Sequence, residues 1–194
     1  MVPVIKITKD EVLGRLARSQ PVRRPGMFPS IADIDLQKHE FAHYVDFGET
    51  VFCGNANFRG TVFAKGANFR GCKFENRADF SWSQFTGPAY FWRTHFLDVA
   101  DFSHLIVNDA GVDRPPNLDP GVADFSWAYF GKQADFNDAR FLGSAFFWRT
   151  VFDGPVDFDQ AKFKAGATFN GTSQEVRLSL LDPSIEDLLR TLTR

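Results

Sequence analysis

The sequence has little of what marks most function classes. Its 22 Lys and Arg nearly balance 24 Asp and Glu, for a formal net charge of −2, so the basic excess typical of nucleic-acid-binding proteins is missing and we expect no direct nucleic-acid binding. No apolar run approaches the ~18 residues that a membrane-spanning helix needs, and the N-terminus lacks the apolar core of a signal peptide. We therefore expect a cytoplasmic protein with no membrane contact.

Residues with reactive side chains are also scarce. Cys53 and Cys72 are the two cysteines, too few for a disulfide framework, and we expect both to be free thiols. The sequence contains no glycine-rich phosphate loop, nucleophile elbow or dinucleotide fingerprint. These absences favour a protein without a cofactor and without catalytic residues.

Phenylalanine, in contrast, is in excess, with 23 copies against 4 Trp and 3 Tyr. Apart from one longer interval, the spacing between Phe residues alternates between five and six, so one five-step and one six-step together form a repeat unit with two Phe. Phe28 and Phe146 lie outside this series. Its members are Phe41, Phe47, Phe52, Phe58, Phe63, Phe69, Phe74, Phe80, Phe85, Phe91, Phe96, Phe102, Phe125, Phe130, Phe136, Phe141, Phe147, Phe152, Phe158, Phe163 and Phe169.

The residues around each Phe repeat as well. The first Phe of a unit commonly follows Ala and then Asp or Asn, as in Ala56-Asn57-Phe58, and the second has a small residue two positions before it. Side chains two apart on an extended segment point the same way, so each step is predicted to be a short strand with the small residue and Phe inward, followed by a corner. Spacings of five and six form no single stripe on a helix, which excludes a helical repeat.

This Ala-(Asp/Asn)-Phe pattern, which runs from Phe41 to Phe169, resembles the pentapeptide-repeat proteins. The resemblance implies an all-β fold, a right-handed, four-sided parallel β-helix, here with about six coils and short α-helical caps. A coil of four such steps, five, six, five and six, is two positions longer than a coil with strict five-residue faces. Two of the four corners are therefore predicted to carry an extra residue.

The chain divides into three segments by this pattern: an N-terminal cap helix and linker over 1–34, the β-helix over 35–172, and a C-terminal cap strand and helix over 173–194. Inside the β-helix, positions 103–122 read as an irregular coil and loop, because the interval from Phe102 to Phe125 is one position longer than a coil. Positions 108–121 are dense in turn-forming residues.

Both ends supply capping helices. Thr8 followed by Glu11 predicts a capping box, and residues 19–34 read as a linker. Near the C-terminus, Asp182-Pro183 offers a helix start before an apolar face, which is also a candidate homodimer contact. That face contains Leu188, Leu189 and Leu192.

One short string of residues matches the sequence signature of a catalytic metal site. His39-Glu40-Phe41-Ala42-His43 matches the His-Glu-x-x-His signature of zinc metalloproteases, which requires a helix so that both His share a face. Phe41 belongs to the Phe series, so we expect the string to be extended, with the two His too far apart to share a metal ion. His104, beside Asp101 and Asp109, is read as a solvated surface residue rather than a metal ligand.

Two kinds of outward residue are candidates for binding a partner. The Asp or Asn before a Phe recurs at one coil position, so Asp79, Asp101 and Asp124 are predicted to stack above Asn57, either bonding local backbone or facing a partner. The distal half is acidic: between positions 96 and 160, eleven Asp face four Lys and Arg. Positions 1–77 are basic, with twelve Lys and Arg against eight Asp and Glu.

Two units replace the Asp or Asn by an aromatic residue and continue with Trp-Arg, the composition of an interface hot spot or of lateral packing. The spacing predicts that these two clusters lie on opposite faces, and that Trp82 and Trp127 share one face. The residues of the two clusters are Tyr90, Trp92, Arg93, Phe146, Trp148 and Arg149.

These features favour a non-enzymatic protein-binding module. The family resemblance implies a narrower role, the mimicry of duplex DNA by which bacterial pentapeptide-repeat proteins bind or protect DNA gyrase and confer antibiotic resistance. Two alternatives remain open: a metal-dependent enzyme that uses His39, Glu40 and His43, and a structural domain of a longer protein.

Overall fold

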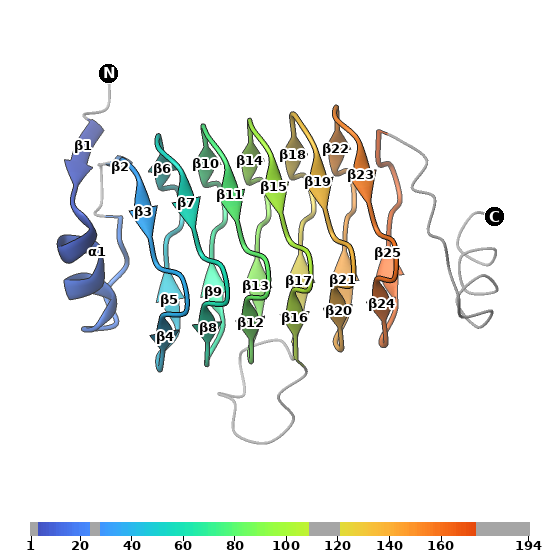
Figure 1. Cartoon of the computed structure of the whole chain (residues 1–194), viewed down its shortest axis with the longest axis horizontal. Coiled ribbons are helices and arrows are strands. Elements are labelled where there is room, and N and C mark those ends of the chain that lie inside the picture. The colour runs from blue at the N-terminus through green and yellow to red at the C-terminus, as the bar shows by residue number, and fades with distance from the viewer. Residues whose placement is uncertain (1–3, 24–27, 109–120, 174–194) are drawn as a thin grey trace.

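The computed structural model describes residues 4–23, 28–108 and 121–173. The chain winds into a four-sided solenoid whose sides are parallel β-sheets, with a short helix at the N-terminal end (Figure 1). This confirms the all-β, four-sided parallel β-helix that the resemblance to the pentapeptide-repeat proteins implied. Six strands on each side, β1 aside, agree with the expected six coils.

Each coil contributes one strand to every side, and we name the sides in chain order. The first side contains β1 (Val4–Ile7), β2 (Phe28–Ile31), β6 (Val51–Phe52), β10 (Lys73–Phe74), β14 (His95–Phe96), β18 (Tyr129–Phe130) and β22 (Val151–Phe152). The acidic side contains β3 (Ile34–Asp35), β7 (Ala56–Asn57), β11 (Ala78–Asp79), β15 (Ala100–Asp101), β19 (Ala134–Asp135) and β23 (Val156–Asp157).

The other two sides complete the prism. The third side contains β4 (Glu40–Phe41), β8 (Val62–Phe63), β12 (Gln84–Phe85), β16 (Ile106–Val107), β20 (Arg140–Phe141) and β24 (Lys162–Phe163). The aromatic side contains β5 (Val45–Asp46), β9 (Ala67–Asn68), β13 (Ala89–Tyr90), β17 (Ala123–Asp124), β21 (Ala145–Phe146) and β25 (Ala167–Thr168). Because the sides follow one another around the coil, the acidic and aromatic sides face in opposite directions.

The interior is a column of phenylalanine rings. Every Phe of the series is buried except Phe169 in the last coil, which is partly buried. Phe69 shows the packing: its ring stacks on Phe47 and Phe91 with centroids 5.0 and 5.1 Å apart, and meets Phe80 edge-on at 5.2 Å. The inward Phe positions predicted from the sequence are therefore confirmed.

Small inward residues link each coil to the preceding one by hydrogen bonds. The hydroxyls of Thr61, Thr94 and Thr150 are buried and donate to carbonyls of the preceding coil at 2.7 to 2.8 Å. Burying a hydroxyl is costly unless it is hydrogen-bonded, so these bonds make Thr acceptable at a position that Ala128 fills in another coil.

The extra residues of each coil lie at two corners, as predicted. Successive strands start at Ala56, Val62, Ala67, Lys73 and Ala78, so that steps of six and five alternate. The longer corners follow the acidic and aromatic sides, and each holds a residue with positive φ. After the acidic side these are Lys38, Gly60, Trp82, His104, Asp138 and Gln160, and after the aromatic side Glu49, Gly71, Arg93, Trp127, Arg149 and Gly171.

The register past Phe102 differs from the prediction. Asp101 pairs with Asp135, not with Asp124, because Ile106–Val107 and Ala123–Asp124 belong to one and the same coil. The interval from Phe102 to Phe125 is thus half a coil plus an insertion at the corner before the aromatic side. The error has a physical cause: the inward pattern repeats every half coil, so half a coil and a whole coil look alike in the sequence.

The N-terminal cap helix is present as predicted. α1 (Lys9–Leu16) starts with a capping box in which Thr8 and Glu11 bond each other's backbone N–H, and it buries Val12 and Leu16. The segment expected to be a linker, however, contains β2, which pairs with β1 and β6. The solenoid therefore begins before Asp35, because an added strand covers the edge that the first coil would expose.

The predicted C-terminal helix, with Leu188, Leu189 and Leu192, lies outside the described residues, as do positions 109–120 of the loop. Within the described ranges, no helix has the length and apolar character required to cross a membrane.

Candidate functional site

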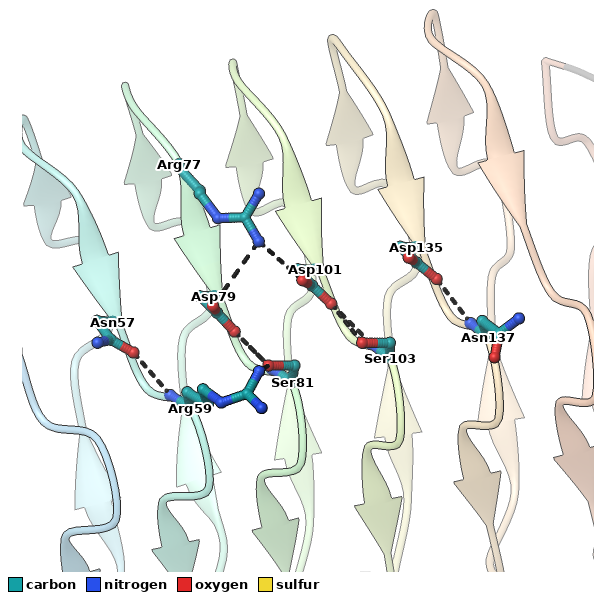
Figure 2. Close-up of polar contacts among 9 residues, drawn as sticks. All are labelled: Asn57, Arg59, Arg77, Asp79, Ser81, Asp101, Ser103, Asp135 and Asn137. Carbon is teal, nitrogen blue, oxygen red and sulfur yellow. Dashed lines mark hydrogen bonds and ion pairs between the residues drawn. The ribbon is translucent and has the colours of Figure 1, made fainter.

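The acidic side presents a ladder of carboxyl and amide side chains (Figure 2). Its members occupy the second residue of each strand and lie in register: Asp35, Asn57, Asp79, Asp101, Asp135 and Asp157. Each accepts the backbone N–H two residues further on, at 2.8 to 3.1 Å. The local-backbone explanation for the Asp or Asn is thus confirmed, and Asp124, bonded in the same way to Ser126, lies on the aromatic side.

Part of this acidic charge is compensated within the ladder. A guanidinium nitrogen of Arg77 lies 2.8 Å from a carboxylate oxygen of Asp101 and 3.7 Å from one of Asp79. For Asp135, partial burial raises the pKa of the carboxyl, and the charges of Asp101 and Asp157 raise it further.

We expect Asp135→Asn to raise the melting temperature at pH 7. A raised pKa means that the ionised form is disfavoured in the fold, and Asn keeps the backbone bond, as Asn57 does with Arg59. The advantage should shrink as pH falls, because below both pKa values the wild-type carboxyl is itself neutral. Thermal melts of both proteins from pH 7 to pH 3 test this, and an equal gain at every pH would contradict it.

The aromatic side carries the two clusters that depart from the Asp pattern. Asp124 pairs with Tyr90 on one neighbouring strand and with Phe146 on the other. Tyr90 and Phe146 therefore share one face, two coils apart, which corrects the prediction of opposite faces. The insertion before the aromatic side accounts for the error. Because the prediction counts its residues as half a coil of strands, the predicted position of every later residue is shifted by half a coil.

The corner after the aromatic side gathers the remaining predicted residues, and we call this corner, with the aromatic side, the aromatic–arginine surface. Register places Arg93 beside Trp127 and Trp127 beside Arg149, as their backbone bonds to Ser126, Trp148 and Asn170 show. Trp127 meets Trp148 edge-on at 5.5 Å. Trp127 was not predicted to belong to this cluster, because the insertion shifted its predicted position by half a coil. The sequence signal that could have placed it at this corner is its position two residues after Phe125.

Arginine side chains lie on these indoles. The Arg149 guanidinium is 4.8 Å from the centre of the Trp127 ring and 4.9 Å from that of Trp148. Two and three coils before Arg149, Arg93 and Arg70 lie 4.3 and 4.8 Å from the centre of the Trp92 ring. The surface is thus an alternation of cations and indoles rather than separate charged and apolar patches.

The surface is open to solvent. Phe146 and Trp127 are each 37 % exposed and Trp148 is 43 % exposed. Along its N-terminal part, a groove of about 1000 Å³ is lined by Arg70, Trp92 and Arg93 and by two carboxylates, Asp46 and Glu49, the second of which is paired with Arg23. A partner could reach all of these side chains without any change in the backbone.

Trp82 lies elsewhere, on the corner after the acidic side, so the expectation that Trp82 and Trp127 share a face is wrong for the same register reason. Its ring stacks on His104 with centroids 4.0 Å apart, and His104 Nδ1 is 3.7 Å from an Asp138 carboxylate oxygen. His104 thus lies between an indole and a carboxylate, and the Asp109 expected beside it lies outside the described residues.

The His39-Glu40-x-x-His43 string is not helical: Glu40 and Phe41 form β4, as expected of an extended segment, whereas Ala42 and His43 lie in the bend that follows. The His39 ring packs edge-on against Phe41 at 4.4 Å. In the part of the chain that the structure describes, no group of three or more His, Cys, Asp or Glu side chains could hold a metal ion. The geometry required by the metalloprotease signature is therefore not formed.

The two cysteines are free, as expected, and their environments differ. Cys72 is buried among the inward small residues, and burial raises its pKa far above the usual thiol value. Cys53 is partly exposed, with its Sγ 3.1 Å from the Ser30 hydroxyl oxygen and from the Ile31 carbonyl oxygen.

We expect one thiol to react in the folded protein at pH 8 and two after denaturation. The thiolate is the reactive form, and Cys72 is both buried and held neutral. Ellman's reagent with and without denaturant measures the count. Cys72→Ala should leave the native reaction unchanged, and two thiols reacting at similar rates in the folded protein would contradict the assignment.

Residues 58–106 match the family model described as pentapeptide repeats (9 copies). The same spacing and the same coil geometry continue on both sides of that segment. Residues 58–106 thus carry pentapeptide repeats, and the described coils on both sides of them have the same Phe-centred form, with two corners of each coil lengthened by one residue. Neither the curated proteins nor the solved structures that were compared contain a match to it.

Proposed function

We propose that this chain is a non-enzymatic protein-binding module whose partner docks on the aromatic–arginine surface. The observation that carries the proposal is the exposure of Phe146, Trp127 and Trp148 side by side on a rigid sheet and corner. Trp, Tyr and Arg dominate the energetics of protein interfaces, and contiguous exposed aromatic residues on a soluble protein usually mark a binding surface.

The backbone supports this assignment. Arg93, Trp127 and Arg149 have φ of 54° to 59°, a conformation that favours glycine, and Gly71 and Gly171 fill the same corner in other coils. Side chains at this corner are therefore not required by the fold. Their presence there has a conformational cost, as it also has for Lys38, Asp138 and Gln160 at the other long corner; what sets this corner apart is that it combines an indole with guanidinium groups.

The solenoid interior supports a non-catalytic role. Phe side chains and small residues fill it from Phe47 to Phe152, so any ligand must bind on the outer surface. A rigid exterior of stacked side chains suits recognition of an extended protein surface.

Site-specific photo-crosslinking tests the proposal. With benzoylphenylalanine at position 148, irradiation of cells that produce the protein should yield a discrete crosslinked protein. The matched control carries the same group at position 84, where Gln84 is exposed on the third side. Equal labelling from both positions, or no discrete product from position 148, would overturn the proposal.

A second candidate partner is a type II topoisomerase such as DNA gyrase, bound through the acidic side as a mimic of duplex DNA. The family resemblance and the register of Asp79, Asp101 and Asp135 favour it. Charge density ranks it second: five carboxylates on this side span about 24 Å at ~4.8 Å per strand, whereas duplex DNA of that length carries about 14 charges.

A gyrase supercoiling assay separates the two candidates. If the acidic side mimics DNA, the wild type should alter supercoiling, the effect should weaken steeply with salt, and Asp101→Asn should reduce it while Trp148→Ala leaves it intact. No effect of the wild type at low salt would remove the topoisomerase candidate. Light scattering on the same samples tests the homodimer expected through Leu188, Leu189 and Leu192.

A further inference from the structure

We propose that the occupant of the aromatic–arginine surface is an acidic protein segment, whose carboxylates pair with Arg70, Arg93 and Arg149. This inference rests on the proposed function and adds the chemistry of the partner. Its starting point is that these three arginines have no acidic partner within the described part of the chain, whereas Arg23 pairs with Glu49 and Arg77 with Asp101.

The three guanidinium groups are already held in position. Arg93 and Arg70 lie over the ring of Trp92, and Arg149 lies near the rings of both Trp127 and Trp148. A guanidinium stacked by its face keeps its N–H edge available, and that edge matches a carboxylate with two parallel hydrogen bonds. Stacking therefore lowers the entropy lost when a carboxylate binds.

The spacing of the cations indicates how a partner would lie. Arg93 and Arg149 occupy the same corner position two coils apart, with Trp127 between them. At ~4.8 Å per coil their backbones are about 10 Å apart along the prism axis. In an extended polyproline-like segment, residues three apart lie on one face about 9 Å apart. Acidic residues at every third position would thus reach both arginines, with apolar side chains against Trp127.

Charge separation around the prism favours such a partner over a second copy bound by the same surface. The acidic side faces away from the aromatic–arginine surface, so its carboxylates do not neutralise Arg93 or Arg149. Two copies joined through this surface would bring like charges together, whereas an acidic segment supplies the missing counter-charges.

The probe is a fluorescein-labelled peptide of four Glu-Pro-Ala units, titrated with the full chain in 50 mM salt and followed by fluorescence anisotropy. Its Lys-Pro-Ala counterpart is the control for charge. We expect the Glu peptide alone to bind, and its dissociation constant to rise at least tenfold at 500 mM salt, because partly exposed ion pairs are screened.

Glycine variants separate binding from folding. Arg93→Gly and Arg149→Gly should each weaken binding about tenfold, the loss of one charge-assisted contact, and should fold normally because Gly71 and Gly171 occupy this corner already. The matched control is Gln160→Gly, at the equivalent position of the corner after the acidic side, where Gly60 is its counterpart. That variant should bind like the wild type.

Several results would overturn the inference. These are failure of the wild type to bind the Glu peptide at millimolar concentration, or binding by both arginine variants that is as tight as binding by the wild type. Tighter binding of a twelve-nucleotide oligothymidylate with the same arginine dependence would reassign the surface to single-stranded nucleic acid. If position 148 crosslinks a discrete protein but the Glu peptide does not bind, the protein-binding module is retained and its acidic partner is rejected. If the Glu peptide binds but position 148 crosslinks no discrete protein, the module is rejected.

Discussion

Replacing Phe69 by Ala should lower the free energy of unfolding by about 3 to 5 kcal/mol. The Phe69 ring is fully buried and is stacked between Phe47 and Phe91, with Phe58 and Phe80 edge-on beside it. Those neighbours are fixed by their own coils, so they cannot move in to fill the space that the ring leaves. Urea denaturation followed by circular dichroism measures the loss.

Phe146→Ala is the matched control for that measurement. Phe146 lies outside the inward series and is 37 % exposed, so its truncation should change the unfolding free energy by less than about 1 kcal/mol. If Phe69→Ala cost no more than Phe146→Ala, the inward register assigned to the Phe series would be wrong.

Gly66→Ala should destabilise the protein by about 2 to 4 kcal/mol, the sum of backbone strain and overpacking. Gly66 has φ of +85°, and a Cβ built there would lie 2.4 Å from the Pro88 carbonyl oxygen in the next coil. The atoms in the way are backbone, so relief requires one coil to move away from the other.

Gly60→Ala separates the two causes. Gly60 has φ of +63°, but the nearest atom to its added Cβ is the Lys38 Cγ at 3.6 Å, an ordinary contact. This variant should lose only the backbone term, about 1 kcal/mol. Thermal melts of the two variants side by side measure the difference, and equal losses would show that the close approach at Pro88 has no energetic consequence.

The fold was predictable because the signal for it is periodic and redundant. Each buried Phe repeats the same information, and an error at any one of them is corrected by the others. The two longer corners were also predictable, since alternating steps of five and six cannot form four equal faces. The start of the solenoid was missed because β2 contains Phe28 and Pro29, which lie outside the repeat.

The surface was less predictable than the core. The inward pattern has a period of half a coil, so the insertion after Val107 moved Asp124, Trp127 and Phe146 from one face to another without disturbing the Phe series. The outward Asp or Asn pattern has the same half-coil period, since Asp46 and Asn57 both carry it on opposite sides, so it does not reveal this shift either. Only the strand pairing could show that Tyr90 and Phe146 share a face and that Trp127 lies between Arg93 and Arg149.

The Asp ladder illustrates how an outward pattern can have a local cause. Its regularity follows from the backbone N–H that each Asp or Asn accepts, as Asp79 does from Ser81 (Figure 2). Phe146 offers no acceptor for that bond, so its presence is not explained by the corner. Departures from a rule with a known structural reason are therefore better guides to binding than the rule itself.

The crosslinking yield from position 146 in the Trp127→Gly/Arg149→Gly protein tests the central claim most directly. Both changes relieve a left-handed backbone conformation while removing one indole and one cation, so stability should remain within about 1 kcal/mol of the wild type. The account predicts that the discrete crosslinked protein obtained with benzoylphenylalanine at position 146 is then lost. A folded double variant that crosslinks the same protein in the same yield would contradict it.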